Sequence, residues 1–271
     1  MKFQKVKNHL LFNSFCCGTI ILLQACTPPI PASKASTPPA RGENTFYQYN
    51  IWWGFVNQVF EGNLTVKELK EKGDIGLGSY SKLDGELVML DGVPYRVRED
   101  GVVDVPSDDE MVAYVDAAFF DPEGSFQIKP TNFDSLIAEV NERLPSLNQF
   151  YSFSVKGEFS YMKCGGLHKQ EKPFEKGLDV LIPERPVFEK ENISGTMVGF
   201  YCPEFIGHIN VAGYHFHFIS DDKSFGGHVM EFSSDVLTVE YDPLLDYQFT
   251  LPGSSEFLNV SLDKEFQYQN K

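Results

Sequence analysis

The sequence predicts an α+β protein in which strands dominate the second half. Apolar residues recur at helical spacing in only a few segments, and short glycine-punctuated runs of alternating polarity fill much of the remainder. The 271 residues are 42% hydrophobic and 23% charged, so the chain can bury a proper core. This length fits one large domain or two domains of roughly 100 to 150 residues.

Residues 1–25 are typical of an export signal. Lys2, Lys5 and Lys7 precede an uncharged, mostly apolar run that ends at Ala25, which is short for a membrane span. The end, Leu23-Gln24-Ala25-Cys26, resembles a bacterial lipobox, whose cysteine becomes a lipidated amino terminus. We therefore predict a membrane-anchored lipoprotein of the bacterial cell envelope. An ordinary secretory signal or an N-terminal anchor would also place the protein outside the cytoplasm.

The mature chain would be acidic and tethered. Cleavage before Cys26 removes three lysines and no acid, which takes the formal charge from −15 to −18 and counts against nucleic-acid binding. The proline-rich segment 26–44 predicts an extended tether, followed by an N-terminal half over 45–145 and a C-terminal half over 146–271. An oxidising envelope would permit one disulfide between Cys164 and Cys202, but sequence does not show that they meet.

The first half opens with two predicted helices and continues with strands. Apolar residues over 51–60 recur at helical spacing and predict a helix of about three turns. Thr65 and Glu68 form a capping box for a second, short helix. Strands are then expected over 86–90, 95–98 and 111–119, with a hairpin turn at Asp91-Gly92.

The second half predicts one helix and many strands. A helix over 132–144 has its apolar residues on one face and ends before Pro145. Strands follow over 150–162 and through most of 195–251.

Three of the five histidines after residue 25 lie within fourteen residues: His215, His217 and His228. Residues two apart in a strand share a face, so His215 and His217 project together. A hairpin centred between Asp222 and Lys223 places His228 opposite His217, at a Cβ separation of about 5 Å. These three imidazoles predict a metal site, although histidines in the core or on the surface of an aromatic strand are the plainer alternative.

Three imidazoles with an open fourth position are typical of catalytic zinc, because structural zinc sites usually close the shell with cysteine. Such a site needs a nearby acid or base for proton transfer. Glu86 stands out because its charge begins an apolar run in a glycine-flanked strand. An ordinary solvent-facing strand residue is the simpler reading of Glu86.

Two blocks of sequence resemble the alpha-acetolactate decarboxylase family. The first contains Gly73-Asp74-Ile75-Gly76-Leu77-Gly78 and Leu83-Asp84-Gly85-Glu86-Leu87. The second contains Gly195-Thr196-Met197-Val198-Gly199-Phe200, Asn210-Val211-Ala212-Gly213-Tyr214-His215-Phe216-His217-Phe218 and Gly226-Gly227-His228. The similarity extends from about Tyr47 to Leu262.

The resemblance implies two related α+β domains, with mixed and antiparallel sheets, and a zinc lyase of acetoin biosynthesis. Its substrate would be the 2-hydroxy-3-oxo acid 2-acetolactate, which it would convert to acetoin and carbon dioxide. By position, His215, His217 and His228 would bind zinc, and Glu86 would be the acid/base partner. The resemblance leaves a homodimer open.

Two positions depart from the family pattern. In the family, an arginine six residues after the Phe of a Gly-x-Phe strand binds the substrate carboxylate, whereas here Phe159 leads to Gly165. Lys163, two residues earlier on the same predicted strand face, is the candidate replacement, although it lacks the guanidinium fork. The family also has a glutamate near its carboxyl terminus, for which Glu265 is the nearest candidate.

Two hypotheses follow. The chain is either a working acetolactate decarboxylase in the envelope, with Lys163 or another base compensating, or a zinc-binding lipoprotein whose lyase activity is lost or altered. Formation of acetoin from 2-acetolactate would separate them.

Overall fold

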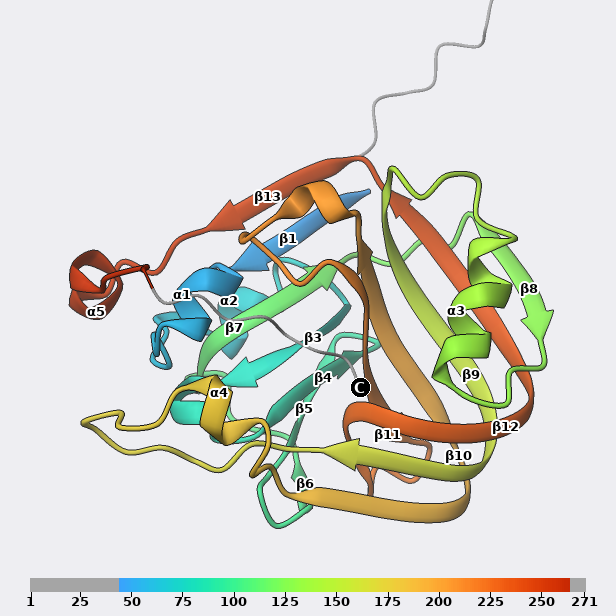
Figure 1. The fold of residues 1–271 in the computed structure, drawn as a ribbon, viewed down its shortest axis with the longest axis horizontal. Coiled ribbons are helices and arrows are strands. Elements are labelled where there is room, and N and C mark those ends of the chain that lie inside the picture. The colour runs from blue at the N-terminus through green and yellow to red at the C-terminus, as the bar shows by residue number, and fades with distance from the viewer. Residues whose placement is uncertain (1–43, 264–271) are drawn as a thin grey trace, which may run out of the picture. The chain divides into compact units, whose positions relative to one another are not determined.

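Two β-sheets form the framework of the computed structural model, which describes residues 44–263 (Figure 1). The first sheet contains β1 (Thr45–Tyr49), β2 (Leu64–Thr65), β3 (Ile75–Tyr80), β4 (Glu86–Leu90), β5 (Val93–Val97), β6 (Val103–Asp104), β7 (Met111–Ala118) and β13 (Asp246–Thr250). Its order is β13-β1-β7-β3-β4-β5-β6, with β2 beside β7. The β1–β13 pairing is parallel and the others are antiparallel, so this sheet is mixed.

The second sheet is antiparallel and contains the longest strands. It consists of β8 (Gly124–Ile128), β9 (Phe150–Gly165), β10 (Val187–Cys202), β11 (Gly213–Ser220) and β12 (Gly226–Leu244), in the order β11-β10-β9-β12-β8. Because β11 also pairs with β12, the pairings of β11, β10, β9 and β12 form a closed circuit. The predicted α+β class, with mixed and antiparallel sheets, is confirmed.

The helices are short: α1 (Trp52–Val56), α2 (Val66–Leu69), α3 (Phe133–Asn141), α4 (Leu178–Leu181) and α5 (Ser255–Asn259), with 3₁₀ turns η1 (Ser81–Leu83) and η2 (Glu204–Ile206). The predicted helix over 51–60 is wrong in length, because Gln58 takes a left-handed φ of 68° soon after α1 ends. Phe60 is nevertheless fully buried, with its ring 5.4 Å from that of Phe55. Its burial needs no continuous helix.

The local turn and cap predictions are confirmed. Thr65 and Glu68 form the capping box of α2, and α3 begins directly after Asn132, the residue at which its helix was predicted to start. Asp91 and Gly92 both take positive φ, 52° and 74°, as a tight hairpin turn requires.

The two sheets do not divide the chain at residue 145. β8 already belongs to the second sheet, and β13 returns to the first sheet from the far end of the sequence. The described residues belong to a single compact unit. Each of the halves predicted over 45–145 and 146–271 therefore contributes strands to both sheets.

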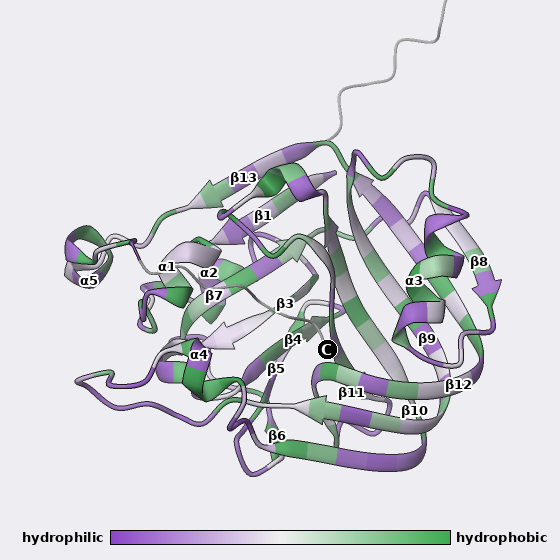
Figure 2. Ribbon diagram, in the orientation of Figure 1, coloured by the Kyte–Doolittle hydropathy of each residue, from purple (hydrophilic) through white to green (hydrophobic). Residues whose placement is uncertain are grey.

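Apolar faces of the strands build the core. Figure 2 shows polar and apolar residues alternating along β9, β10 and β12. α3 lies over the second sheet (Figure 1), and its buried Leu136 and Val140 belong to the same apolar cluster as Phe153 of β9. A separate cluster, which includes Val88 of β4 and Phe200 of β10, joins the two sheets.

The two cysteines of this region are free and buried. Cys164 packs in the cluster beneath α3, whereas Cys202 packs in the cluster between the sheets. The disulfide that the sequence left open is therefore absent between them.

Several sequence predictions lie outside the described residues: the signal over 1–25, the lipidation site Cys26, nearly all of the tether over 26–44, and Glu265. Within residues 44–263, no helix has the length and apolar character needed to cross a membrane.

Candidate metal centre

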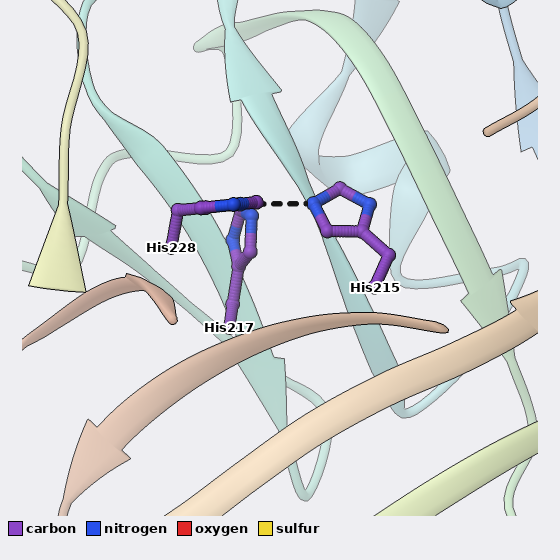
Figure 3. Close-up of side chains that lie close together, drawn as sticks. All are labelled: His215, His217 and His228. Carbon is purple, nitrogen blue, oxygen red and sulfur yellow. Dashed lines mark hydrogen bonds between the residues drawn. The ribbon is translucent and has the colours of Figure 1, made fainter. Parts of the chain in front are cut away.

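Three histidines lie together on the hairpin formed by β11 and β12 (Figure 3). His217 pairs with His228 across the hairpin, in the register that the sequence predicted. His215, two residues before His217, projects from the same face. The turn is held by Ser220, whose Oγ accepts a hydrogen bond from the Phe225 N–H at 3.0 Å.

The three imidazoles are close enough to share one ion. One ring nitrogen from each lies within 4.8 Å of the others. His215 Nε2 and His228 Nδ1 are 3.1 Å apart. The ring centroid of His217 lies 5.0 Å from that of His215 and 5.3 Å from that of His228. The rings are tilted rather than stacked, so their nitrogens converge (Figure 3).

Burial keeps these rings neutral. It lowers the pKa of His215 to about 4, with the charge of Arg185 acting in the same direction. The pKa values of His217 and His228 lie well below the usual range, again mainly through burial. Neutral imidazole is the form that binds metal ions.

Hydrogen bonding fits the rings to a metal. His217 Nδ1 lies 2.8 Å from the Leu87 carbonyl oxygen, which can only accept, so Nδ1 carries the proton and Nε2 has a free lone pair. His215 Nδ1 is buried and has no hydrogen-bond partner. Three neutral nitrogen donors suit zinc and other imidazole-preferring divalent metals.

Glu86 lies beside the histidines. Its Oε2 is 3.8 Å from His217 Nε2, and the residue is only 5% exposed. Burial raises the pKa of Glu86 to about 7, although the nearby charge of Arg185 opposes the rise. The structure thus brings together the acid and the three histidines that the sequence singled out.

These groups line a cavity of about 260 Å³. Its polar lining includes Glu86, Arg185 and the three histidines, and its apolar lining includes Trp52, Phe55 and Leu178. A small polar molecule would therefore meet convergent polar groups within mostly apolar walls.

A buried polar network supports one wall of this cavity. Asn210 Nδ2 donates to Asp116 Oδ1 at 2.9 Å and to Gln48 Oε1 at 3.0 Å. The hydroxyl of Tyr114, a cavity residue, donates to Asn210 Oδ1 at 2.7 Å. Asn210 follows η2, whereas its partners lie in the first sheet, so the network fixes the connection before β11 against that sheet.

Lys163 does not line the cavity. It pairs in register with Glu189 on β10 and Glu231 on β12, and its Nζ lies 3.8 Å from Glu189 Oε1. Both glutamates are exposed, so Lys163 lies within a charged outer patch. Strand periodicity predicts that Lys163 and Gly165 share a face, but it gives no distance from Lys163 to the histidine cluster.

Arg185 is the cavity cation that sequence reasoning missed. It lies two residues before β10, in the connection from β9, a segment with neither strand alternation nor a motif. Val187 pairs with Gly165, and Gly166 N–H donates to the Pro186 carbonyl at 3.0 Å, so the chain returns to the end of β9. No local sequence signal reports this return.

Known proteins match this chain over most of its length. The family model described as alpha-acetolactate decarboxylase matches residues 46–264. The alpha-acetolactate decarboxylase of Methanosarcina mazei is 35% identical over 225 residues, which cover 83% of this chain and 78% of the relative. That of Streptococcus thermophilus is 38% identical over 212 residues, which cover 75% of this chain and 87% of the relative.

The fold agrees with the sequence matches. The crystal structure of alpha-acetolactate decarboxylase from Bacillus subtilis strain 168 aligns with a TM-score of 0.77 at 31% identity, covering 81% of this chain and 94% of that chain. The matched region contains both sheets, Glu86 and the histidine cluster. The protein is an enzyme of the lyase class, and its chain belongs to the alpha-acetolactate decarboxylase family.

Proposed function

We propose that this protein converts 2-acetolactate to acetoin and carbon dioxide, with zinc bound by His215, His217 and His228. The observation that carries this proposal is the cluster of three neutral imidazoles in one cavity with Glu86. When bound, zinc would supply a Lewis acid that stabilises the negative charge developing on substrate oxygens.

Glu86 would supply the proton that the reaction requires. Loss of carbon dioxide breaks a carbon–carbon bond and leaves its electron pair on the neighbouring carbon, which takes up a proton to give acetoin. Because burial raises the pKa of Glu86 to about 7, its carboxyl can hold a proton at neutral pH. Glu86 also lies close to His217, beside the ligand atoms.

The cavity walls would protect this proton transfer. Trp52, Phe55 and Leu178 present apolar surface to the same space as Glu86. Such walls limit the water that competes with a positioned acid and strengthen electrostatic contacts inside the site.

A zinc-binding lipoprotein with lost or altered lyase activity is the less favoured alternative. Its support was Gly165, which stands where the family has the arginine that binds the substrate carboxylate. Glu86 nevertheless lies beside the histidines, and the cavity has its own cation, Arg185. The chemical groups for decarboxylation are therefore present in one space.

We also propose that the enzyme acts in the bacterial cell envelope, held by a lipid on Cys26. The support is the sequence of residues 1–26 and the proline-rich segment that follows. The homodimer stays a prediction.

The direct test measures acetoin and zinc in the purified full-length protein. We expect acetoin to form from racemic 2-acetolactate and about one zinc per chain. A His168→Ala variant is the matched control, because His168 is an exposed histidine paired with Glu99, on the surface. Stoichiometric zinc without acetoin above the uncatalysed rate would overturn the proposed activity.

A further inference from the structure

Arg185 occupies the space that a side chain at Gly165 would need. A Cβ atom built on Gly165 would lie 2.8 Å from Arg185 Cδ and 3.1 Å from Arg185 Nη1. It would also lie 3.0 Å from the sulfur of Met230, another cavity residue. Any larger residue at position 165 therefore displaces Arg185, so the glycine and the arginine depend on each other.

The Arg185 guanidinium carries a charge that the protein does not neutralise locally. Within residues 44–263 it forms no ion pair, and its Nε is buried without a hydrogen-bond partner. A guanidinium stays protonated at all relevant pH values. Leaving a buried donor unpaired is costly, so this donor is suited to an acceptor that enters with a ligand.

The charge of Arg185 acts on the chemistry of the cavity. Arg185 lowers the pKa values of Glu86 and of all three histidines, so it lies within electrostatic range of each. The histidines are neutral, and two acidic residues, Glu86 and Asp134, line the cavity with Arg185. An anionic ligand would thus meet a fixed positive charge beside the proposed metal-binding atoms.

We propose that Arg185 binds the carboxylate of the substrate and that Gly165 is the residue that makes room for it. This inference rests on the proposed function. A carboxylate matches the planar fork of a guanidinium, which can donate two parallel hydrogen bonds. Arg185 then supplies the cation for which the sequence offered Lys163, and it comes from the connection before β10 rather than from β9.

The reaction itself predicts how loss of Arg185 affects the kinetics. The carboxylate loses its charge as carbon dioxide forms, so its contact with Arg185 is strongest in the bound substrate. Removing a contact made mainly in the ground state raises KM more than it lowers kcat. An Arg185→Gln variant should therefore show a large rise in KM and a smaller change in kcat.

The test compares two probes that differ in the carboxylate. The first is 2,3-dihydroxy-2-methylbutanoate, which keeps the acid but has no ketone to drive decarboxylation; the second is acetoin, which is neutral. In Arg185→Gln, calorimetric binding of the acid should weaken about 10- to 100-fold, as expected for a lost charge-assisted contact, while acetoin binding changes less than about twofold. Arg143→Gln is the matched control, because Arg143 lies just after α3, does not line the cavity and pairs with Glu139.

Unchanged binding of the acid in Arg185→Gln would overturn the inference, and so would equal weakening of both probes, which marks a structural role. Failure of the proposed function would give a different result, because the parent protein, with Arg185 intact, would then form no acetoin. Arg185→Lys keeps the charge without the fork, so its affinity for the acid should lie between those of the parent and Arg185→Gln.

Substitutions at Gly165 test the other half of the proposal. Gly165→Ala should weaken binding of the acid although Arg185 is still present, because the new methyl group displaces Arg185 Cδ. Gly165→Arg combined with Arg185→Ala should recover part of the affinity that loss of Arg185 removes, because alanine leaves no Cδ beside position 165 and a guanidinium returns to the same end of β9. Full affinity in Gly165→Ala would show that the glycine does not serve Arg185.

Discussion

His217 Nδ1 donates a hydrogen bond to the carbonyl oxygen of Leu87, and this 2.8 Å contact joins the two sheets at the candidate metal centre. β11 of the second sheet carries the histidine, and β4 of the first sheet carries the carbonyl group next to Glu86. One bond thus fixes the tautomer of a proposed ligand and holds it near the proposed acid.

Loss of His217 should reduce zinc affinity steeply. We expect His217→Ala to bind zinc about 100-fold more weakly than the parent or worse, because two remaining imidazoles leave the coordination shell incomplete. Competition with a chromogenic chelator measures the affinity, and His168→Ala should match the parent. Stoichiometric zinc in a variant with alanine at 215, 217 and 228 would disprove the ligand assignment.

Replacement of Glu86 should separate chemistry from metal binding. Glu86→Gln keeps the shape of the side chain but cannot act as the acid, so kcat should fall about 100- to 10,000-fold while zinc content is unchanged. Glu189→Gln, on an exposed part of β10, is the matched control. A kcat within threefold of the parent in Glu86→Gln would assign the proton transfer to another group.

Sequence reasoning succeeded where the determinants are local. The facing of His217 and His228 follows from strand alternation and a short turn, and the capping box of α2 needs only Thr65 and Glu68. The helix over 51–60 failed because apolar spacing reports burial but not the left-handed residue Gln58.

Arg185 could not be predicted for a related reason. It reaches the cavity through a connection of some twenty residues that begins after Gly165 and returns to it. Alternation along β9 pointed instead to Lys163, because periodicity gives the face of a strand but not the neighbours that occupy it. A contact that forms when the chain returns from many residues away leaves no local pattern in the sequence.

Lys163 should therefore be dispensable. Its partner is Glu189 on an exposed surface, and surface ion pairs contribute about 0 to 1 kcal/mol. We expect kcat/KM of Lys163→Ala to stay within twofold of the parent value, in contrast to Arg185→Gln. A tenfold loss of kcat/KM without loss of zinc would return Lys163 to the list of candidates for carboxylate binding.

Lipidation at Cys26 is tested by processing. Cys26→Ala should accumulate as the unprocessed precursor and incorporate no labelled palmitate. Cys17→Ala changes a cysteine inside the predicted signal and should be processed and labelled like the parent. Normal maturation of Cys26→Ala would instead indicate a plain secretory signal.

Asp116 should make stability depend on pH above neutrality. Its side chain is buried and accepts a hydrogen bond from Asn210, and burial raises its pKa to about 8, well above the value of an unfolded chain. The folded protein therefore binds a proton at Asp116 that the unfolded chain has already lost. This contribution to stability is complete below pH 4 and is lost as the pH rises through about 8.

Urea denaturation of the parent and Asp116→Asn between pH 7.5 and 9 isolates this effect, because unfolded-state histidines are then mostly neutral and the other titrating groups are common to both proteins. The parent should lose up to about 1.4 kcal/mol of unfolding free energy per pH unit below the pKa, levelling off above it. Asp116→Asn cannot ionise, so its curve should be flatter across the same range. Parallel curves for the two proteins would mean that Asp116 is ionised in the folded state at neutral pH, despite its burial.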